Sequence, residues 1–185
     1  MPTAKSFDAE AIRAAIERLA GAISERHRGG EKILLLGIAN GGIELARRLS
    51  GRLSALNAQL STSAGTLDIS FHRDDIARHP IPKEFAPTHI PVDVDGATVI
   101  LVDDVLFSGR TVKAALDELF DHGRPRKVEL AVLVDRGGRR LPFAPDYCAL
   151  QLSARDSEKV VVRLDASAPS RDFIQLVPAS SAKLN

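Results

Sequence analysis

The sequence predicts an α/β domain in which helices flank a mainly parallel central sheet. Short apolar runs rich in β-branched residues alternate along the chain with segments whose apolar residues recur every three or four positions. Continuous apolar runs are typical of strands buried on both faces of a parallel sheet. The 185 residues suffice for one full core and are few for two, so we expect a single domain over residues 1–185.

The first helix and the first strand are predicted close to the N-terminus. Asp8 can cap a helix that ends near residues 29–30. One side of this helix is apolar and carries Ile12, Ile16, Leu19, Ala20 and Ile23. Residues 33–38 then form a buried strand, and residues 43–53 form a second amphipathic helix.

Further strands and a third helix fill the rest of the chain. The strands are expected at residues 66–71, 98–103, 128–135, 147–152 and 160–164. The helix begins near residues 109–111, because apolar side chains then recur at Val112, Ala115, Leu116, Leu119 and Phe120. In sheets of this kind, binding sites lie at the carboxyl ends of the strands.

The most informative segment is residues 99–111, VILVDDVLFSGRT, in which a strand ends at Asp103 and Asp104 before a polar turn opens the third helix. The free N–H groups of a first helical turn and the positive end of its dipole suit a phosphate monoester. Consecutive strand side chains point to opposite sides, so the two carboxylates are poorly placed to hold one ion together. A carboxylate here can accept hydrogen bonds from sugar hydroxyls. In the alternative, Asp104 and Ser108 only cap the helix.

This segment resembles the phosphoribosyl pyrophosphate (PRPP) motif of type I phosphoribosyltransferases. Its continuation, LAVLVDRG followed by RRLP, is similar to the PyrR group, pyrimidine-operon regulators that also act as uracil phosphoribosyltransferases. The similarity covers residues 64–75, 90–119 and 123–147, and more weakly the first helix and residues 157–165. It implies the type I phosphoribosyltransferase fold with a flexible loop over the site. It also implies Mg2+ as cofactor, PRPP, uracil or UMP, and pyrophosphate as ligands, and a homo-oligomer, either a dimer or a tetramer.

The resemblance also implies roles for the residues of the motif. Asp103 and Asp104 are assigned to the ribose and, indirectly, to the metal, with Asp104 better placed as a proton acceptor. The phosphoribosyl group is expected to contact Val105, Leu106, Phe107, Ser108, Gly109, Arg110 and Thr111. The reaction is displacement of pyrophosphate from C1′ of PRPP by N1 of uracil, and no dedicated general base is identified.

A second strand-end loop, which contains Asn40, Gly41 and Gly42, occupies the position of the pyrophosphate loop. Two glycines permit close approach of backbone N–H groups to an anion. PyrR proteins usually carry Thr-Arg-Gly here, so a cation that would face pyrophosphate is absent. The alternative is an ordinary turn between a strand and a helix.

Residues 72–91 contain four of the ten prolines and no apolar periodicity, as expected of a functional lid or an insertion. By resemblance this is the flexible loop over PRPP, and Arg73 is the best candidate for a cation facing the reacting phosphates. Arg78 and Lys83 are alternatives. Arg73 is equally compatible with a salt bridge to one of the two aspartates that follow it.

A third strand-end loop follows residues 128–135 and is expected to hold the pyrimidine base. The contacts come chiefly from backbone groups of Val134, Asp135, Arg136 and Gly137, although Arg136 fits a role in supporting the sheet edge equally well. PyrR proteins generally show Gly-His-Arg-Glu where this chain reads Gly-Gly-Arg-Arg over residues 137–140.

Two other functions compete with the enzyme. One is a UMP-responsive, RNA-binding attenuator, for which the net charge of +1 offers no general basic field. PyrR regulators carry a Thr-Arg pair followed by His-Glu on the first helix, whereas this chain has Glu17-Arg18 and Gly21-Ala22. Ala144 and Leu150 replace basic residues, so RNA is retained as a disfavoured partner. The other is a catalytically silent nucleotide-binding protein.

The remaining polar residues give no further motif. The sole cysteine, Cys148, excludes an internal disulfide and fits a reducing cytoplasm. No apolar run reaches membrane-spanning length, so no membrane partner is expected. The five histidines do not show the sequence spacing of metal ligands; they are His27, His72, His79, His89 and His122.

Overall fold

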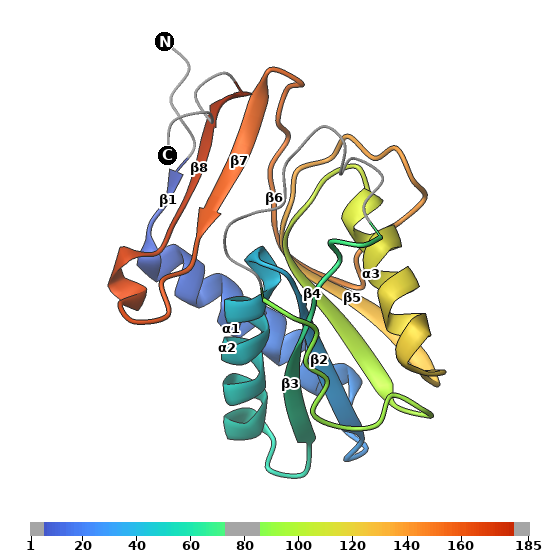
Figure 1. Ribbon diagram of the computed structural model, residues 1–185. Helices are drawn as coiled ribbons and strands as arrows, with labels where there is room; N and C mark the ends of the chain where they lie inside the picture. Colours follow the sequence, from blue (N-terminus) through green and yellow to red (C-terminus); the bar gives the residue numbers. More distant parts are fainter. Residues whose placement is uncertain (1–5, 73–85, 180–185) are drawn as a thin grey trace.

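The computed structural model describes residues 6–72 and 86–179, which form two sheets and the helices around them (Figure 1). The larger sheet is parallel, with strand order β3-β2-β4-β5-β6. Its strands are β2 (Lys32–Ile38), β3 (Ser61–Leu67), β4 (Thr98–Leu106), β5 (Lys127–Asp135) and β6 (Tyr147–Gln151). The helices are α1 (Ala9–Arg26), α2 (Gly41–Leu56), α3 (Arg110–His122) and the 3-10 helix η1 (Pro169–Arg171).

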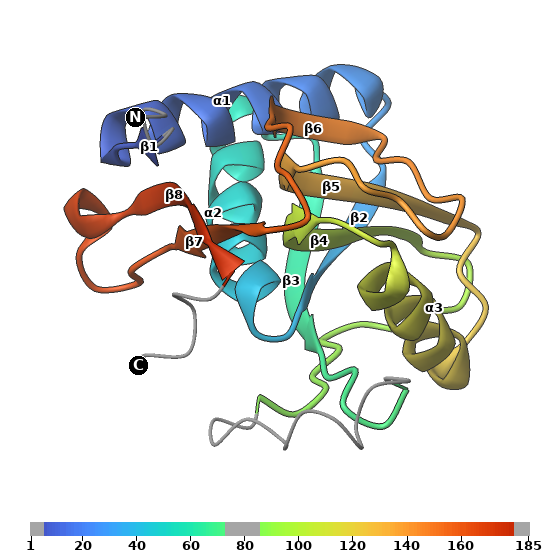
Figure 2. The ribbon, with the colours of Figure 1, turned by 90° about the horizontal axis from the view of Figure 1, so that it is seen from above.

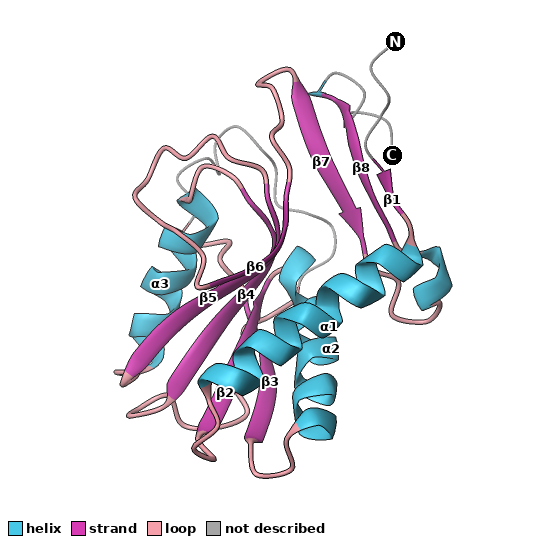
Figure 3. Cartoon of the chain, turned by 180° about the vertical axis from the view of Figure 1, so that it is seen from behind, coloured by secondary structure: helices cyan, strands magenta, loops and turns pink. Residues whose placement is uncertain are grey.

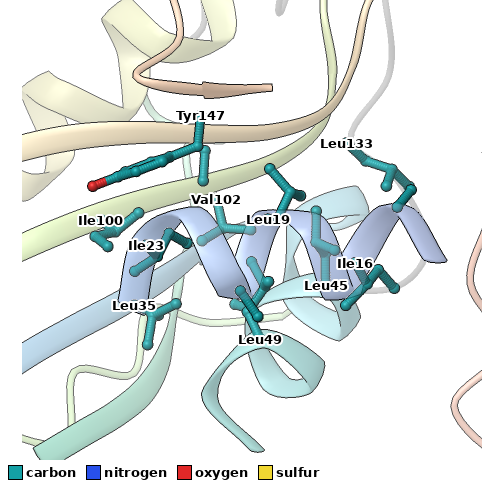
Figure 4. Packing of buried hydrophobic residues seen from close by; sticks show 14 of the residues in the cluster. Ile16, Leu19, Ile23, Leu35, Leu45, Leu49, Ile100, Val102, Leu133 and Tyr147 are labelled. Carbon is teal, nitrogen blue, oxygen red and sulfur yellow. The ribbon is translucent and has the colours of Figure 1, made fainter. Parts of the chain in front are cut away.

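Helices cover both faces of the large sheet, with α1 and α2 on one face and α3 on the other (Figure 2). Alternate residues of a strand enter the two cores: Leu35 of β2 faces α1 and α2, and Leu36 lies in the core beneath α3. Figure 4 shows the first core, in which Leu19 of α1 and Leu49 of α2 lie against Val102 of β4. Because both faces are buried there, the middle parts of β2, β4 and β5 are almost entirely apolar, whereas the edge strand β3 carries polar residues.

A smaller antiparallel sheet of order β1-β8-β7 stands at the carboxyl-end side of the large sheet (Figure 3). It contains β1 (Ser6–Phe7), β7 (Glu158–Arg163) and β8 (Phe173–Pro178). Arg48 of α2 holds its connecting loop by donating to the carboxylate of Asp172 and, over 2.9 Å, to the carbonyl of Asp165. The smaller sheet therefore borders the edge at which the parallel strands end.

The predicted fold class is confirmed, and several boundaries differ. The strand expected at residues 66–71 is wrong, because β3 spans residues 61–67 and the chain turns at Asp68, whose Oδ1 accepts hydrogen bonds from the amide and hydroxyl of Ser70. The second helix starts at Gly41 instead of residue 43 and ends at Leu56. The strand expected at residues 98–103 continues to Leu106, so the acidic pair lies inside it. Strands β1 and β8 were not expected.

Within the described part of the chain, no helix is both long and apolar enough to cross a membrane.

Candidate active site

The loops that follow β2, β4 and β5 lie at one edge of the large sheet. In the parallel register Leu106 pairs with Asp135, and Gly37 pairs with Val102. The residues after these positions therefore emerge side by side, as expected for strand ends in an α/β sheet. This edge contains the described site residues predicted from the sequence.

The loop between β4 and α3, residues 107–111, has the backbone of an anion site. Gly109 adopts φ +90°, and a Cβ there would lie 3.0 Å from the Phe143 ring, so only glycine fits without strain. Gly109 has no side chain with which to cap the helix, and no acidic residue lies in its first turn. The hydroxyl oxygen of Ser108 accepts a long hydrogen bond of 3.3 Å from the Arg110 amide. The first turn of α3 thus presents N–H groups and a positive dipole end to an anion.

Arg139 fixes the far side of this loop. Its guanidinium donates to the carbonyl of Phe107 over 2.9 Å and to the carbonyl of Phe143 over 2.9 Å. It also pairs with the Asp135 carboxylate over 2.5 Å. The Ser108 carbonyl accepts from the amides of the two residues after Arg139. The carbonyls of Phe107 and Ser108 are therefore engaged by the segment that contains Arg139.

Arg136 packs beneath the same loop. Its guanidinium lies 4.0 Å from the centre of the Phe107 ring and donates to the carbonyl of Arg155 over 3.2 Å. The side chain is only 8% exposed. This placement favours the supporting role for the Arg136 side chain and leaves base contacts to the backbone.

Gly138 also lies against Phe107, where a Cβ would come within 2.6 Å of the ring. The histidine that PyrR proteins carry at this position would therefore require the ring to move.

The two acids at the end of β4 lie close together, because their side chains share a hydrogen bond. Strand alternation predicted that they point to opposite sides, and that expectation is wrong at this strand end. The Asp104 carboxyl lies against Gly41 so closely that a Cβ there would be 2.4 Å from its carbon. Gly42 is equally tight, because its Cβ would meet the carbonyl of Val102. The glycines of this loop thus let the start of α2 approach the acids, and Asp104 does not cap α3.

Burial controls the protonation of both acids. Burial raises the pKa of Asp103 well above its ordinary value, and the neighbouring charge of Asp104 adds to the effect. Burial also raises the pKa of Asp104, although a hydrogen bond with Asp103 and the positive charge of Lys159 oppose the rise. A cationic ligand placed beside Asp104 would relieve this repulsion.

Lys159 of β7 is a candidate site residue that the sequence did not single out. It is exposed on the smaller sheet, and its positive charge lowers the pKa of Asp104. In the sequence it is one cation beside an ordinary apolar run, so only the weak similarity over residues 157–165 pointed to this region. It brings a positive charge to the acids, although the loop over residues 40–42 has none.

The acids are suited to Mg2+ only in a limited way. Mg2+ takes oxygen ligands in octahedral geometry and usually keeps several waters or phosphate oxygens. Asp103 and Asp104 offer neighbouring carboxylate oxygens, but Asp103 is buried at 6% exposure. Two carboxyl groups cannot fill an octahedron, so the pair fits an ion that is held mainly by ligand oxygens with Asp104 alongside.

The predicted loop over residues 72–91 is described only at its ends. Arg73, Arg78 and Lys83 lie outside the described residues. After this gap, His89 forms an antiparallel bridge with Thr66, with both backbone hydrogen bonds at 2.9 Å. The segment therefore returns to the edge of β3 before β4 begins.

Known proteins resemble this chain in sequence and in fold. A model of the phosphoribosyl transferase domain matches residues 4–166. The "Bifunctional protein PyrR" of Streptomyces coelicolor is 48% identical over 166 residues, covering 89% of this chain and 84% of that protein. The protein of the same name from Deinococcus radiodurans is 44% identical and covers 95% and 94% of the two chains.

Among solved structures, a hypoxanthine phosphoribosyltransferase from Trypanosoma cruzi, bound to IMP, superposes with a TM-score of 0.70 at 21% identity. The match covers 99% of this chain and 95% of that one, and at this identity it shows the shared fold. The family match spans most of the chain, and the relatives exceed 40% identity over nearly their full length. The chain therefore belongs to the phosphoribosyl transferase domain family and, within it, to the PyrR group.

Proposed function

We propose that this chain transfers the phosphoribosyl group of PRPP to uracil and releases UMP and pyrophosphate. The observation that carries the proposal is the loop over residues 107–111, which Arg139 holds at the Phe107 carbonyl and which opens α3 without a side-chain cap, directly after the acids of β4. An anion bound at this loop would lie on the same strand end as a carboxylate that can accept hydrogen bonds from sugar hydroxyls. A phosphorylated pentose uses both features at once.

Each part of the substrate has a candidate partner. The 5′-phosphate binds at residues 107–111, and the ribose hydroxyls donate to Asp104, with Asp103 behind it. Pyrophosphate lies near residues 40–42, where Lys159 supplies positive charge. The base is held by backbone groups of residues 134–137, and the Asp135 side chain is already occupied by the Gly137 amide and Arg139.

The chemistry is a substitution at C1′. The bond from C1′ to the pyrophosphate oxygen breaks, the bond from C1′ to N1 of uracil forms, and the N1 proton passes to solvent or to a phosphate oxygen. Positive charge develops on the ribose ring during this step, and Asp104 is placed to stabilise it. Bound Mg2+ would neutralise charge on the leaving pyrophosphate. The fixed loop contributes by holding both reactants in line.

RNA-dependent regulation is less well supported by the described residues. Glu17 on α1 pairs with Arg52 over 2.7 Å, which neutralises a cation on this face. Arg139, a basic residue retained from the PyrR regulators, is occupied by the phosphate loop. Fewer cations thus remain to meet an RNA backbone. Cytoplasmic location and homo-oligomeric assembly stay predictions.

The test is product formation from PRPP, Mg2+ and a panel of bases, followed by chromatography of nucleotides. Uracil should give UMP and an equal amount of pyrophosphate. Asp104→Asn should lower kcat at least tenfold while changing the unfolding midpoint little. Arg139→Ala should raise the KM for PRPP about tenfold, because losing loop order weakens charge-assisted phosphate contacts.

Arg140→Ala is the matched control, since the Arg140 side chain is exposed and only its backbone amide contacts the loop. If the chain binds PRPP but forms no nucleotide from any base, it is a catalytically silent nucleotide-binding protein. Filter binding of the leader RNA of its own pyrimidine operon tests the regulator. Micromolar or tighter RNA binding that depends on UMP would reverse the order of the two functions.

A further inference from the structure

A second cluster of ligand-type side chains lies at the far end of α3. His72, which follows β3, meets Glu118 and Asp121 of the helix: its Nε2 is 3.1 Å from Glu118 Oε2 and 3.3 Å from Asp121 Oδ2. One atom from each residue lies within 4.8 Å of the other two. His122 follows directly, with Nε2 3.0 Å from Glu118 Oε1. This cluster could not be predicted from the sequence, because His72 is far from the other members along the chain.

The cluster is separate from the proposed active site. Asp121 lies eleven positions after Arg110, so the helical rise places it about 16 Å along the axis from the start of α3. His72 is the first residue of the segment expected to cover PRPP, but no member of the cluster belongs to the loops over residues 40–42, 107–111 and 134–137.

The carboxylates of the cluster have imidazoles but no stronger cation among the described residues. Glu118 Oε1 accepts from the Thr88 hydroxyl over 2.7 Å, which leaves Oε2 directed at His72. No described lysine or arginine pairs with Glu118 or Asp121. Glu118 is also largely buried, at 14% side-chain exposure. Two acidic groups at this place therefore favour an added positive charge.

Two of the three ligand-atom separations are close to those of tetrahedral coordination, and all three are within 4.8 Å. With bonds of 2.0–2.1 Å to nitrogen and oxygen, the edge of a zinc tetrahedron is about 3.3 Å. The two separations from His72 Nε2, 3.1 and 3.3 Å, are close to this edge. The donor set of imidazole nitrogen and carboxylate oxygen suits Zn2+ and not Mg2+, which prefers oxygen alone.

We propose that His72, Glu118 and Asp121 form a binding site for a Zn2+-type divalent cation, with His122 or water completing the tetrahedron. The ion links the segment after β3 to the end of α3. Thr88 already joins the same place, because its hydroxyl donates to Glu118 and accepts from the Asp68 amide over 3.0 Å. Metal binding should therefore stabilise the folded chain.

The test is calorimetric titration of the tag-free full chain with ZnCl2, in a Cys148→Ser background that removes the competing thiol. We expect one equivalent to bind with micromolar or tighter affinity, and the melting temperature to rise with zinc concentration. Co2+ in place of zinc should give the intense visible absorption of a tetrahedral site. His72→Ala and Asp121→Asn should each weaken binding at least tenfold.

His89→Ala is the matched control, because it removes an exposed histidine that the cluster does not contain. It should bind zinc as the parent chain does. Equal zinc affinity of the parent and His72→Ala would overturn the proposal. A melting temperature that does not change with zinc concentration would also overturn the proposal, since His72 would then form only an ion pair with the carboxylates. Both readouts are independent of phosphoribosyl transfer.

Discussion

At the scale of single residues, the two adjacent acids of β4 are the side chains whose burial is most unfavourable for folding. Asp103 is 6% exposed, and its Oδ1 accepts from the amide of Asp104 over 3.0 Å. A buried carboxyl beside a second carboxyl destabilises the fold once it ionises. Such residues are retained where function needs them, which agrees with a proposed role in holding the ribose.

The raised pKa of Asp103 predicts how stability depends on pH. Between the ordinary and the raised pKa, the unfolded chain releases its proton first, so stability falls as pH rises through this window. Asp103→Asn cannot ionise and should be more stable than the parent at pH 8. Its advantage should shrink as the pH approaches 4, where the carboxyl is protonated in the folded state and largely so in the unfolded chain.

Urea unfolding at several pH values measures this effect. Asp156→Asn serves as the control, because Asp156 is exposed and should show no pH-dependent gain. An advantage of Asp103→Asn that stays constant from pH 4 to pH 8 would contradict the assignment of the raised pKa to this residue.

At the scale of elements, the start of α2 can lie close against β4 because Gly41 and Gly42 have no Cβ. The strand and helix periods predicted both elements, since apolar spacing alone fixes which residues face a core. The ends of the elements were harder to predict. The start of the edge strand β3 could not be predicted, because its residues are polar. After Leu67 the chain leaves the sheet through side-chain hydrogen bonds, which hydrophobic periodicity does not predict.

Gly41→Ala should disturb the site through this contact. Its Cβ would meet the Asp104 carboxyl at 2.4 Å, so Asp104 must shift, and we expect kcat to fall about tenfold with a loss of roughly 1–3 kcal/mol in the free energy of unfolding. Gly51→Ala in the same helix meets nothing within 4 Å and should stabilise the chain by about 0.5–1 kcal/mol.

Steady-state kinetics and urea unfolding of these two variants separate the effect of the contact with Asp104 from the effect of helix propensity. If Gly41→Ala behaved like Gly51→Ala in both measurements, the approach of α2 to Asp104 would have no role in the site.

At the scale of the whole molecule, Arg48 joins the smaller sheet to the main domain. Its guanidinium bonds the carboxylates of Glu44 and Asp172 and the carbonyl of Asp165. Asp172 is 5% exposed, and it also accepts from the Asp165 amide over 2.8 Å. The position of Lys159 near the acids depends on this attachment, because β7 pairs directly with β8.

Arg48→Met should leave the Asp172 charge buried and unpaired, which costs about 3–5 kcal/mol of folding free energy. Hydrogen exchange of β7 and β8 should accelerate more than that of β2. The neighbouring Arg47→Met is the control: Arg47 is exposed and Glu44 keeps its pair with Arg48, so this change should cost at most about 1 kcal/mol. Equal destabilisation by the two variants would show that Arg48 does not anchor the smaller sheet.

By itself the sequence determined the fold class and the family and predicted the phosphate-binding loop, because each is encoded in contiguous residues: the strand and helix periods, the run LAVLVDRG and the run VDDVLFSGRT. Tertiary structure alone decided what lies opposite these runs. It brought Lys159 towards Asp104, used Arg139 to hold the phosphate loop, and gathered His72 with Glu118 and Asp121. These partners are far apart in the chain, and only the register and packing of the elements place them together.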